Sequence, residues 1–234
     1  MTEKELILIP CSGRKTPDGS LSLEGRQLIE ALSTPKSQKL KRLRKKVAGS
    51  FNIDLSSGSS ERCLMPAYKR YSGNLYKKIS SNAWEELKNR EDLEVVIISA
   101  LYGAIYWDEP IIDYDVDMTK NIKEGRRLNT WWRKNGLPEI VSAYIEGKDH
   151  DVVRSFLSGD YRKALLNIQE KVDPTWLLYE YPALGSGSNY YRGRDVSDAI
   201  MNRNVVCPNC SSKKTRRISK DRYGCVSCKE EYRV

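Results

Sequence analysis

The chain has 234 residues, which is enough for one sizeable hydrophobic core and a small second unit. Its 40 Lys and Arg residues outnumber 31 Asp and Glu residues, giving a formal net charge of +9 that favours a polyanionic partner, most often nucleic acid. No apolar run reaches the roughly 18 residues of a membrane span, and the first five residues are too polar for a signal peptide. We therefore expect a soluble, cytoplasmic protein with no membrane partner.

The chain opens with a short apolar run, Leu6 to Ile9, that predicts a first buried strand ending at Pro10. A basic turn follows, and its backbone N–H groups around Gly13 suit a phosphate or an anionic intermediate. A solvated turn that happens to be basic explains the same residues. The side chains proposed to bind an anion here are Ser12, Arg14 and Lys15.

Residues 18 to 60 are predicted to form a helical insertion or lid. From Lys36 to Lys46, seven of eleven residues are Lys or Arg, and Leu40 and Leu43 are spaced to share one helical face. Such a helix either binds phosphates or simply exposes a charged face to solvent. Residues 51 to 62, rich in Ser and Gly, are predicted to be a connecting loop.

The stretch from Met65 to Ile79 carries three tyrosines and four Lys or Arg residues around a Ser-Gly-Asn turn. Aromatic rings interleaved with cations suit bases stacked beside backbone phosphates, although half-buried packing gives the same pattern. The candidate contacts here are Gly73, Asn74 and Tyr76. A helix with an N-cap at Ser80 is expected to follow and to run to Arg90.

A second buried strand is predicted from Val95 to Ile98, because its β-branched run suits a strand covered on both faces. Ser99, Tyr102 and Gly103 follow directly. Polar groups at the end of such a strand lie at the rim of the sheet, where open α/β folds place their ligand crevices. We therefore expect a ligand site here.

A group of carboxylates comes next along the chain, beside Tyr114. One of them could activate water, stabilise a developing cation or help to hold Mg²⁺, and a solvated acidic loop is the simpler alternative. The group consists of Asp108, Glu109, Asp113, Asp115 and Asp117.

Three further helices are predicted at residues 126–134, 138–146 and 161–171. Trp131 and Trp132 are expected in the core. The chain has a single histidine, His150, in a polar Lys-Asp-His-Asp context that predicts an exposed side chain. A lone histidine argues against a Ser-His-Asp triad, so catalysis would rest on carboxylate, Lys, Tyr, Ser or Cys side chains.

Two later stretches complete the main part of the chain. Ser158, Tyr161 and Lys163 lie at a predicted helix start, whose N–H groups attract anions. Residues 176–181 are predicted to form a strand, and residues 185–193 a flexible loop that either closes over a ligand or links to the next unit.

Four of the six cysteines form two CxxC pairs separated by 14 residues, a spacing close to that of a zinc ribbon: Cys207, Cys210, Cys225 and Cys228. Four thiolates can hold one structural Zn²⁺ and stabilise a segment too small to fold alone. The predicted domains are 1–203 and 204–234. The ribbon is basic, so we expect it to contact nucleic acid or a partner rather than to catalyse. Cys11 and Cys63 are interpreted as small buried hydrophobes.

Four motifs occur in an order that resembles the YaaA peroxide-stress family: the turn with Ser12 and Lys15, Gly73 to Tyr76, Ser99 to Gly103, and Ser158 to Tyr161. The resemblance covers roughly residues 5 to 170. Its most specific part is the Leu-Tyr-Gly block followed eleven residues later by Tyr114. The opening turn differs from the family's Ser-Pro-Ala-Lys type and the ribbon is additional, so the chain resembles a divergent member.

The resemblance implies a mixed α/β fold, with a central sheet flanked by helices, ahead of the small C-terminal ribbon. Members of the family are described as DNA-binding, with a basic cleft likened to those of DNA glycosylases, so DNA is expected over RNA. The cleft implied for this chain is lined by Ser12, Lys15, Tyr76, Ser99, Tyr102, Tyr114, Asp117, Ser158 and Tyr161.

The leading hypothesis is an enzyme that acts on a nucleobase by N-glycosidic cleavage, base exchange or modification. A carboxylate, Asp117 or Asp113, would stabilise a cationic sugar, and a flipped base would lie between Tyr76 and Tyr102. Lys15 would neutralise phosphate or attack as an amine. The residues assigned to catalysis are Lys15, Asp117, Asp113 and Tyr102. The alternatives are a non-enzymatic DNA-binding stress-response protein and a nucleotide or small-molecule enzyme.

Overall fold

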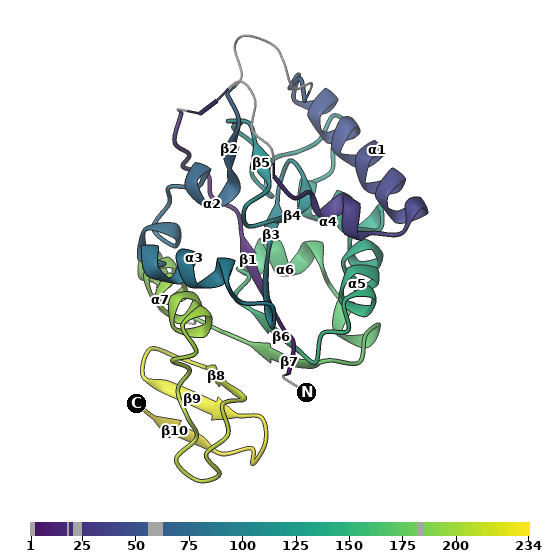
Figure 1. The fold of residues 1–234 in the computed structure, drawn as a ribbon. Helices are drawn as coiled ribbons and strands as arrows, with labels where there is room; N and C mark the ends of the chain where they lie inside the picture. The colour runs from purple at the N-terminus through teal and green to yellow at the C-terminus, as the bar shows by residue number, and fades with distance from the viewer. Residues whose placement is uncertain (1–2, 18, 21–24, 56–62, 182–184) are drawn as a thin grey trace.

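The protein is built around a five-stranded sheet with the strand order β4-β3-β1-β6-β7 (Figure 1). The computed structural model describes residues 3–17, 19–20, 25–55, 63–181 and 185–234. Four strands run parallel, and the edge strand β4 pairs antiparallel to β3. The predicted mixed α/β class is therefore confirmed. The strands are β1 Glu5–Pro10, β3 Leu93–Ser99, β4 Gly103–Tyr106, β6 Val152–Ser155 and β7 Thr175–Leu178.

Helices cover both faces of this sheet. Figure 1 shows α3 and α7 on one side and α1, α4 and α5 on the other. The helices are α1 Thr34–Ser50, α2 Ala67–Arg70, α3 Ser81–Lys88, α4 Leu128–Lys134, α5 Leu137–Gly147, α6 Gly159–Ala164 and α7 Ser188–Ile200. The 3-10 helices are η1 Leu28–Ala31, η2 Tyr76–Lys78, η3 Ile168–Glu170 and η4 Gly185–Gly187. A short pair, β2 Met65–Pro66 and β5 Pro110–Ile111, lies beside the sheet.

The hydrophobic pattern accounts for the centre of the molecule. Leu6 to Ile9 of β1 are fully buried, as a strand with helices on both faces requires. In α1, Leu40 and Leu43 lie in the core as their spacing predicts, and Trp131 and Trp132 are fully buried. The part of the chain that the structure describes holds no helix with the length and apolarity to cross a bilayer.

One arginine of the basic helix α1 is structural. Arg44 is buried, and its Nη1 donates to Glu109 Oε1 at 3.0 Å. Its Nε and Nη2 donate to the carbonyl oxygens of Tyr102 and Ala104 at 2.9 and 2.7 Å. The second oxygen of Glu109 accepts the backbone N–H of Leu28 at 2.8 Å. Arg44 and Glu109 therefore connect α1 and η1 to the turn between β3 and β4.

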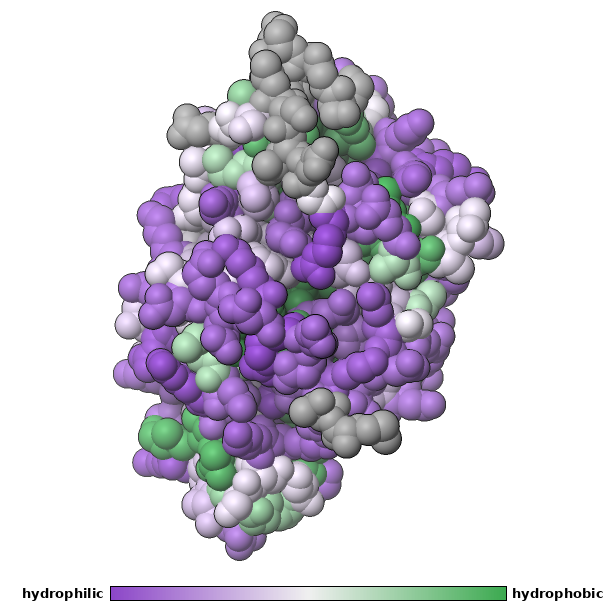
Figure 2. Space-filling model, in the orientation of Figure 1, coloured by the Kyte–Doolittle hydropathy of each residue, from purple (hydrophilic) through white to green (hydrophobic). Residues whose placement is uncertain are grey.

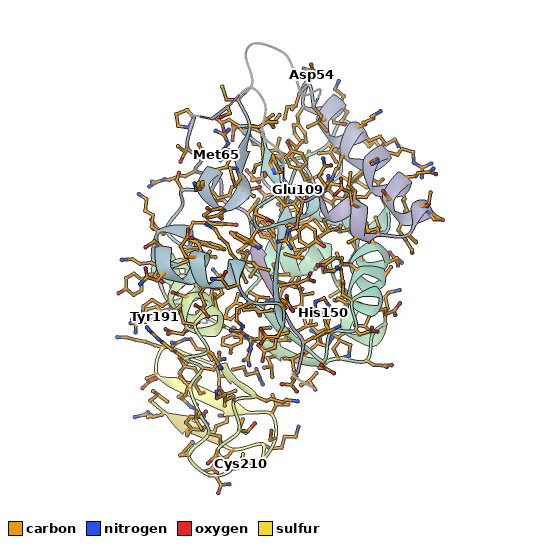
Figure 3. All side chains as sticks on the ribbon, in the orientation of Figure 1. Asp54, Met65, Glu109, His150, Tyr191 and Cys210 are labelled. Carbon is orange, nitrogen blue, oxygen red and sulfur yellow. The ribbon has the colours of Figure 1, made fainter. Side chains whose placement is uncertain are left out.

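This pairing corrects the prediction of a single acidic cluster after β3. Glu109, labelled in Figure 3, is 2% exposed and bonded to Arg44, so it belongs to the core. Asp108 instead forms an ion pair with Arg26, with 3.1 Å between Arg26 Nε and Asp108 Oδ2. Asp113, Asp115 and Asp117 remain near Tyr114.

The prediction that His150 is exposed is wrong. The side chain is buried, and its Nε2 lies 3.0 Å from Glu94 Oε2, which also accepts the Tyr144 hydroxyl. The polar neighbours of His150 in sequence gave no sign of Glu94, which lies 56 residues earlier in the chain. His150 therefore has a structural role near the start of β3, at the opposite end of the strand from the candidate site.

Two predicted elements differ from the structure. Residues 185–193 were expected to be a loop, but α7 begins at Ser188 and packs beside α3 and η2. The helix predicted at 161–171 divides into α6 and η3, with Asn167 in the left-handed region at φ 66° between them. The predicted insertion at 18–60 and loop at 51–62 lie partly outside the described residues.

The C-terminal strands β8 Thr215–Arg217, β9 Arg222–Cys225 and β10 Glu231–Arg233 form an antiparallel sheet that docks on the main sheet. The backbone N–H of Glu180 donates to Arg217 O at 2.9 Å, and the Tyr179 hydroxyl donates to Thr215 O at 2.9 Å. Arg217 also binds both oxygens of the buried Asp195 in α7 at 2.6 and 2.7 Å. The ribbon is thus held to the segment just after β7 and to α7.

We predict that Arg44→Met lowers the free energy of unfolding by about 3–5 kcal/mol, because it leaves the Glu109 carboxylate buried without its charged partner. Urea denaturation of the full chain measures the change. Lys45→Met, on the exposed face of the same helix, should change stability by less than about 0.5 kcal/mol. Equal losses for the two variants would show that the buried pair has no special structural role.

Candidate functional site

The candidate site lies where the connections from the sheet diverge. After β1 the chain crosses to β3 on one side, and after β6 it crosses to β7 on the other. In an open α/β sheet such a switch point leaves a crevice at the carboxyl ends of the two strands. Here it brings Cys11, just past β1, to Tyr161, in α6 after β6, with 3.0 Å between Sγ and the hydroxyl oxygen. Cys11 is buried, as the sequence predicts, and its thiol contacts the Tyr161 hydroxyl at this switch point, a region called the crevice below.

A buried chain of hydroxyls continues from the crevice along β3. The Tyr114 hydroxyl lies 2.9 Å from Ser99 Oγ and 2.7 Å from the Tyr71 hydroxyl. The backbone N–H of Tyr102 donates to Ser99 Oγ at 3.1 Å. Burial raises the pKa of Tyr71 and Tyr114 well above the usual value, so both phenols stay protonated at neutral pH. Tyr71 was not singled out from the sequence.

Tyr76 and Tyr102, expected to hold a flipped base, are core residues in this structure. They are 5% and 8% exposed. The Tyr76 hydroxyl donates to Pro10 O at 2.9 Å, and the Tyr102 hydroxyl accepts the backbone N–H of Ile112 at 3.3 Å. Burial raises the pKa of Tyr102 to about 12. In this conformation the two rings support the ends of β1 and β3 instead of bracketing an open space, and Tyr161 is the more exposed ring.

Lys15 forms one wall of a pocket of about 340 Å³ beside the buried phenols. Its Nζ lies 4.0 Å from the centre of the Tyr114 ring, and its one hydrogen bond, to Gly13 O, is long at 3.5 Å. Burial lowers the pKa of Lys15, partly opposed by the charges of Asp113 and Asp115. The pocket is lined by Gly13, Lys15, Asp113, Tyr114 and Asp115.

The basic turn after β1 is held against the segment that contains Gly73. The backbone N–H of Ser72 donates to Arg14 O at 3.0 Å. A Cβ at position 73 would lie 2.3 Å from Ser12 Oγ, so a larger residue there would force the Ser12 hydroxyl out of its place. Ser12 Oγ accepts the backbone N–H of Arg14 at 3.1 Å, and the Arg14 side chain is exposed. The structure thus brings together Ser12 and Gly73, while Asn74 is exposed at the rim.

Asp117 is fixed by the turn that follows it. Its Oδ1 accepts the Thr119 backbone N–H at 2.7 Å, the Thr119 hydroxyl at 2.5 Å and the Lys120 N–H at 3.2 Å. Burial alone would raise the pKa of Asp117, but these hydrogen bonds lower it below its usual value. Asp117 is therefore an ionised carboxylate, and its charge helps to raise the pKa of Tyr161. Asp113 and Asp115 are exposed at the pocket rim.

Of the residues predicted after β6, Ser158 and Tyr161 lie at the crevice. Lys163 forms an ion pair with Asp160 instead. The Lys163 Nζ lies 3.4 Å from Asp160 Oδ1, which also accepts Asn129 Nδ2 at 3.2 Å. Because α6 has only six residues, its N-terminus has only a small dipole with which to attract an anion.

Gly103, with φ 77°, is needed for the fold, since a Cβ there would lie 3.0 Å from the ring of Trp132.

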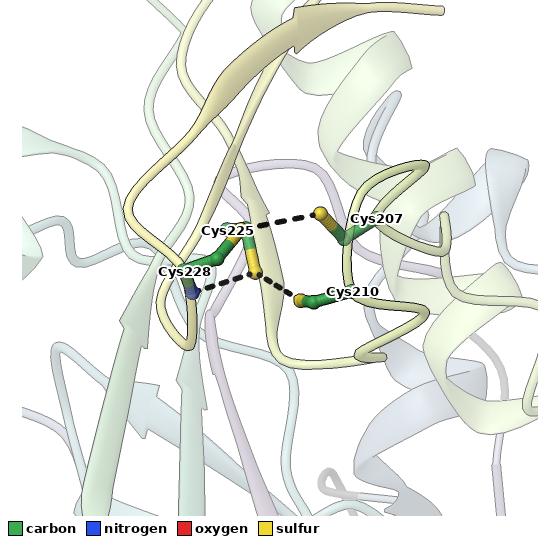
Figure 4. Close-up of side chains that lie close together, drawn as sticks. All are labelled: Cys207, Cys210, Cys225 and Cys228. Carbon is green, nitrogen blue, oxygen red and sulfur yellow. Dashed lines mark hydrogen bonds between the residues drawn. The ribbon is translucent and has the colours of Figure 1, made fainter.

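The four ribbon cysteines converge as the zinc prediction requires (Figure 4). Their Sγ atoms all lie within 4.8 Å of one another, and the Cys207–Cys228 and Cys210–Cys225 pairs are each 3.5 Å apart. Tetrahedral Zn–S bonds of about 2.3 Å place sulfurs about 3.8 Å apart, whereas a disulfide brings them to about 2.05 Å. The geometry fits a four-thiolate metal site. Within the described ranges, the carboxylates form no comparable cluster, which leaves the Mg²⁺ alternative without support.

The donor set has the chemistry that a structural zinc needs. Burial raises the pKa of Cys225, but hydrogen bonds, first among them that from the Cys228 backbone N–H at 3.5 Å, outweigh burial and lower it to about 6. A backbone hydrogen bond from Ser212 lowers the pKa of Cys210, but burial and hydrogen bonds with the other three thiols outweigh it and raise that pKa. A thiolate is the form that binds zinc. Four cysteines also fill a tetrahedral shell, so an ion bound here would have a structural role.

We predict that Cys210→Ser removes the bound zinc and lowers the thermal unfolding midpoint, because three thiolates hold the ion more weakly than four. Elemental analysis of the purified chain should find one zinc ion per molecule in the unaltered protein. Cys63→Ser, outside the cluster, serves as the matched control and should leave the zinc content unchanged. Full zinc retention in Cys210→Ser would contradict the assignment.

Comparison with known proteins agrees with this arrangement. A family model described as "Peroxide stress protein YaaA" matches residues 6–181. These residues include all of the main sheet except Glu5, the first residue of β1. No curated protein matches the chain. The match covers the crevice between β1 and β6 and the pocket at Lys15, and it ends before α7 and the four cysteines. The chain therefore belongs to the YaaA peroxide stress protein family, and α7 and the cysteine ribbon extend it beyond the matched region.

Proposed function

We propose that this protein binds nucleic acid and acts on a nucleobase by cleaving or exchanging an N-glycosidic bond. The observation that carries the proposal is the contact between the Cys11 thiol and the Tyr161 hydroxyl at the switch point between β1 and β6, near the ionised Asp117. Lys15 and its pocket lie along the same edge of the sheet.

Charge and surface support a nucleic-acid substrate. The chain has a formal net charge of +9, and the exposed cations of the crevice segments include Arg14, Lys77 and Lys163. Most of the face drawn in Figure 2 is hydrophilic, as expected of a surface that meets a solvated backbone. DNA is the proposed substrate, on the basis of the DNA binding described for the family.

The chemistry assigns each group a different task. Loss of a base leaves positive charge on the sugar, and the ionised carboxylate of Asp117 would stabilise it. Lys15 would neutralise a phosphate or the departing base, since its amine lies over the Tyr114 ring and forms no ion pair with any carboxylate of the described residues. The partly exposed ring of Tyr161 would stack on the base after it leaves the helix.

The test incubates the purified chain with oligonucleotides containing a panel of modified and damaged bases and detects released bases by mass spectrometry. Asp117→Asn and Lys15→Met should each slow base release by about 100-fold, the range typical of a lost electrostatic or acid–base contribution. Lys88→Met, an exposed change at the end of α3 near the opposite end of β3 from Ser99, should leave the rate within about twofold.

The outcomes separate the three classes of protein. Tight, salt-dependent oligonucleotide binding with no base release from any substrate would indicate a non-enzymatic DNA-binding protein. Turnover of free nucleotides without affinity for oligonucleotides would indicate a small-molecule enzyme. Unchanged base release in the Asp117 and Lys15 variants would overturn the catalytic assignments.

A further inference from the structure

We propose that Arg192 is the centre of a phosphate-binding subsite at the carboxyl end of β7, with Arg162 as its second cation. Arg192 lies in α7, outside the residues that match the family. The assignment of the phosphate to a nucleic-acid backbone rests on the proposed function, whereas the presence of an anion site does not.

The first observation is that the Arg192 charge is buried and poorly bonded. The residue is 4% exposed, and its Nε is buried without a hydrogen-bond partner. Its Nη1 donates to the side-chain oxygen of Asn189, a neutral group. Its guanidinium carbon lies 4.6 Å from the centre of the Tyr181 ring. An amide oxygen and a ring face do not balance a full positive charge.

The second observation is that the nearby carboxylate belongs to another arginine. Asp195 accepts Arg217 Nε and Nη2 at 2.6 and 2.7 Å and the Tyr181 hydroxyl at 3.0 Å. Among the residues that the structure describes, no ion pair includes Arg192. The buried network of Arg192, Asp195 and Arg217 therefore carries one excess positive charge.

Arg162, which follows Tyr161 in α6, is a second cation close enough to affect the charge of Arg192. Its Nε donates to Leu157 O at 3.1 Å, and its Nη1 lies 3.1 Å from Glu180 Oε1. Burial lowers the pKa of Arg192 and the charge of Arg162 lowers it further, an effect that Tyr181 and the more weakly acting Asp195 partly oppose. Because Glu180 already pairs with Arg162, Arg192 is the cation that lacks a counter-ion.

The position of the two arginines selects the ligand. Tyr181 follows β7 and Arg162 follows Tyr161, so both arginines lie at the edge of the sheet that holds the crevice. A planar guanidinium binds two oxygens of a phosphate at once, and a phosphate that reached Arg192 would supply a partner for its buried Nε. A phosphate here would neutralise the excess charge and would lie one strand away from the Cys11–Tyr161 contact.

The test measures binding of inorganic phosphate and of a short single-stranded oligonucleotide to the full chain by isothermal titration calorimetry. Arg192→Gln should weaken both affinities by about tenfold, the effect of losing one charge-assisted contact. Arg194→Gln is the matched control, because it removes the same charge from an exposed position on the same helix. It should leave phosphate affinity within about twofold.

A second measurement covers the case in which Arg192→Gln fails to fold. The unaltered protein should show a higher thermal midpoint in phosphate than in chloride at equal ionic strength, and Arg194→Gln should keep this difference. No stabilisation by phosphate, or equal affinity of Arg192→Gln and the unaltered chain, would overturn the subsite. Phosphate binding that depends on Arg192 without any base release would leave the subsite standing and contradict only the proposed enzyme activity.

Discussion

The parallel alignment of β1 with β3 and β6 is the constraint on which the rest of this structure depends. Ile9 pairs with Ile97, and Leu8 pairs with Ser155, so the three strands end at nearly the same level. The ladder extends past the strands, because Cys11 N donates to Ile98 O at 3.0 Å and Phe156 N donates to Leu8 O at 2.9 Å. A slip in this pairing would move the basic turn, the Ser99 hydroxyl and Tyr161 away from one another.

Elements with a strong local pattern were predictable, and those defined by distant contacts were not. The apolar runs of β1 and β3 and the leucine spacing of α1 each identify a buried surface within a few residues. In contrast, α7 begins in a Gly/Ser/Asn/Tyr-rich stretch and is stabilised by tertiary contacts, including Gly193 against the Leu75 carbonyl. The partner of Arg44 lies 65 residues away, which no local pattern shows.

The same distinction applies to the candidate site. The carboxyl-end rule located Ser99 from sequence, and a predicted helix start located Ser158. Applied strictly, the carboxyl-end rule would also have identified Cys11 directly after β1. The rule could not separate exposed tyrosines from buried ones, since Tyr76, Tyr102 and Tyr161 look alike in sequence. Only the packing shows that the first two are core residues. The number of basic residues was also an incomplete guide to the binding surface, because Arg44 and Arg217 are paired with carboxylates inside the protein.

We propose the crevice between β1 and β6 as the nucleic-acid site. The most direct measurement is photochemical crosslinking of the full chain to a single-stranded oligonucleotide carrying a photoreactive base, followed by mass spectrometric mapping of the attached peptides. The account predicts crosslinks at the turn containing Lys15 and at the segment containing Tyr161. Crosslinks confined to α1 or to the cysteine ribbon would contradict it.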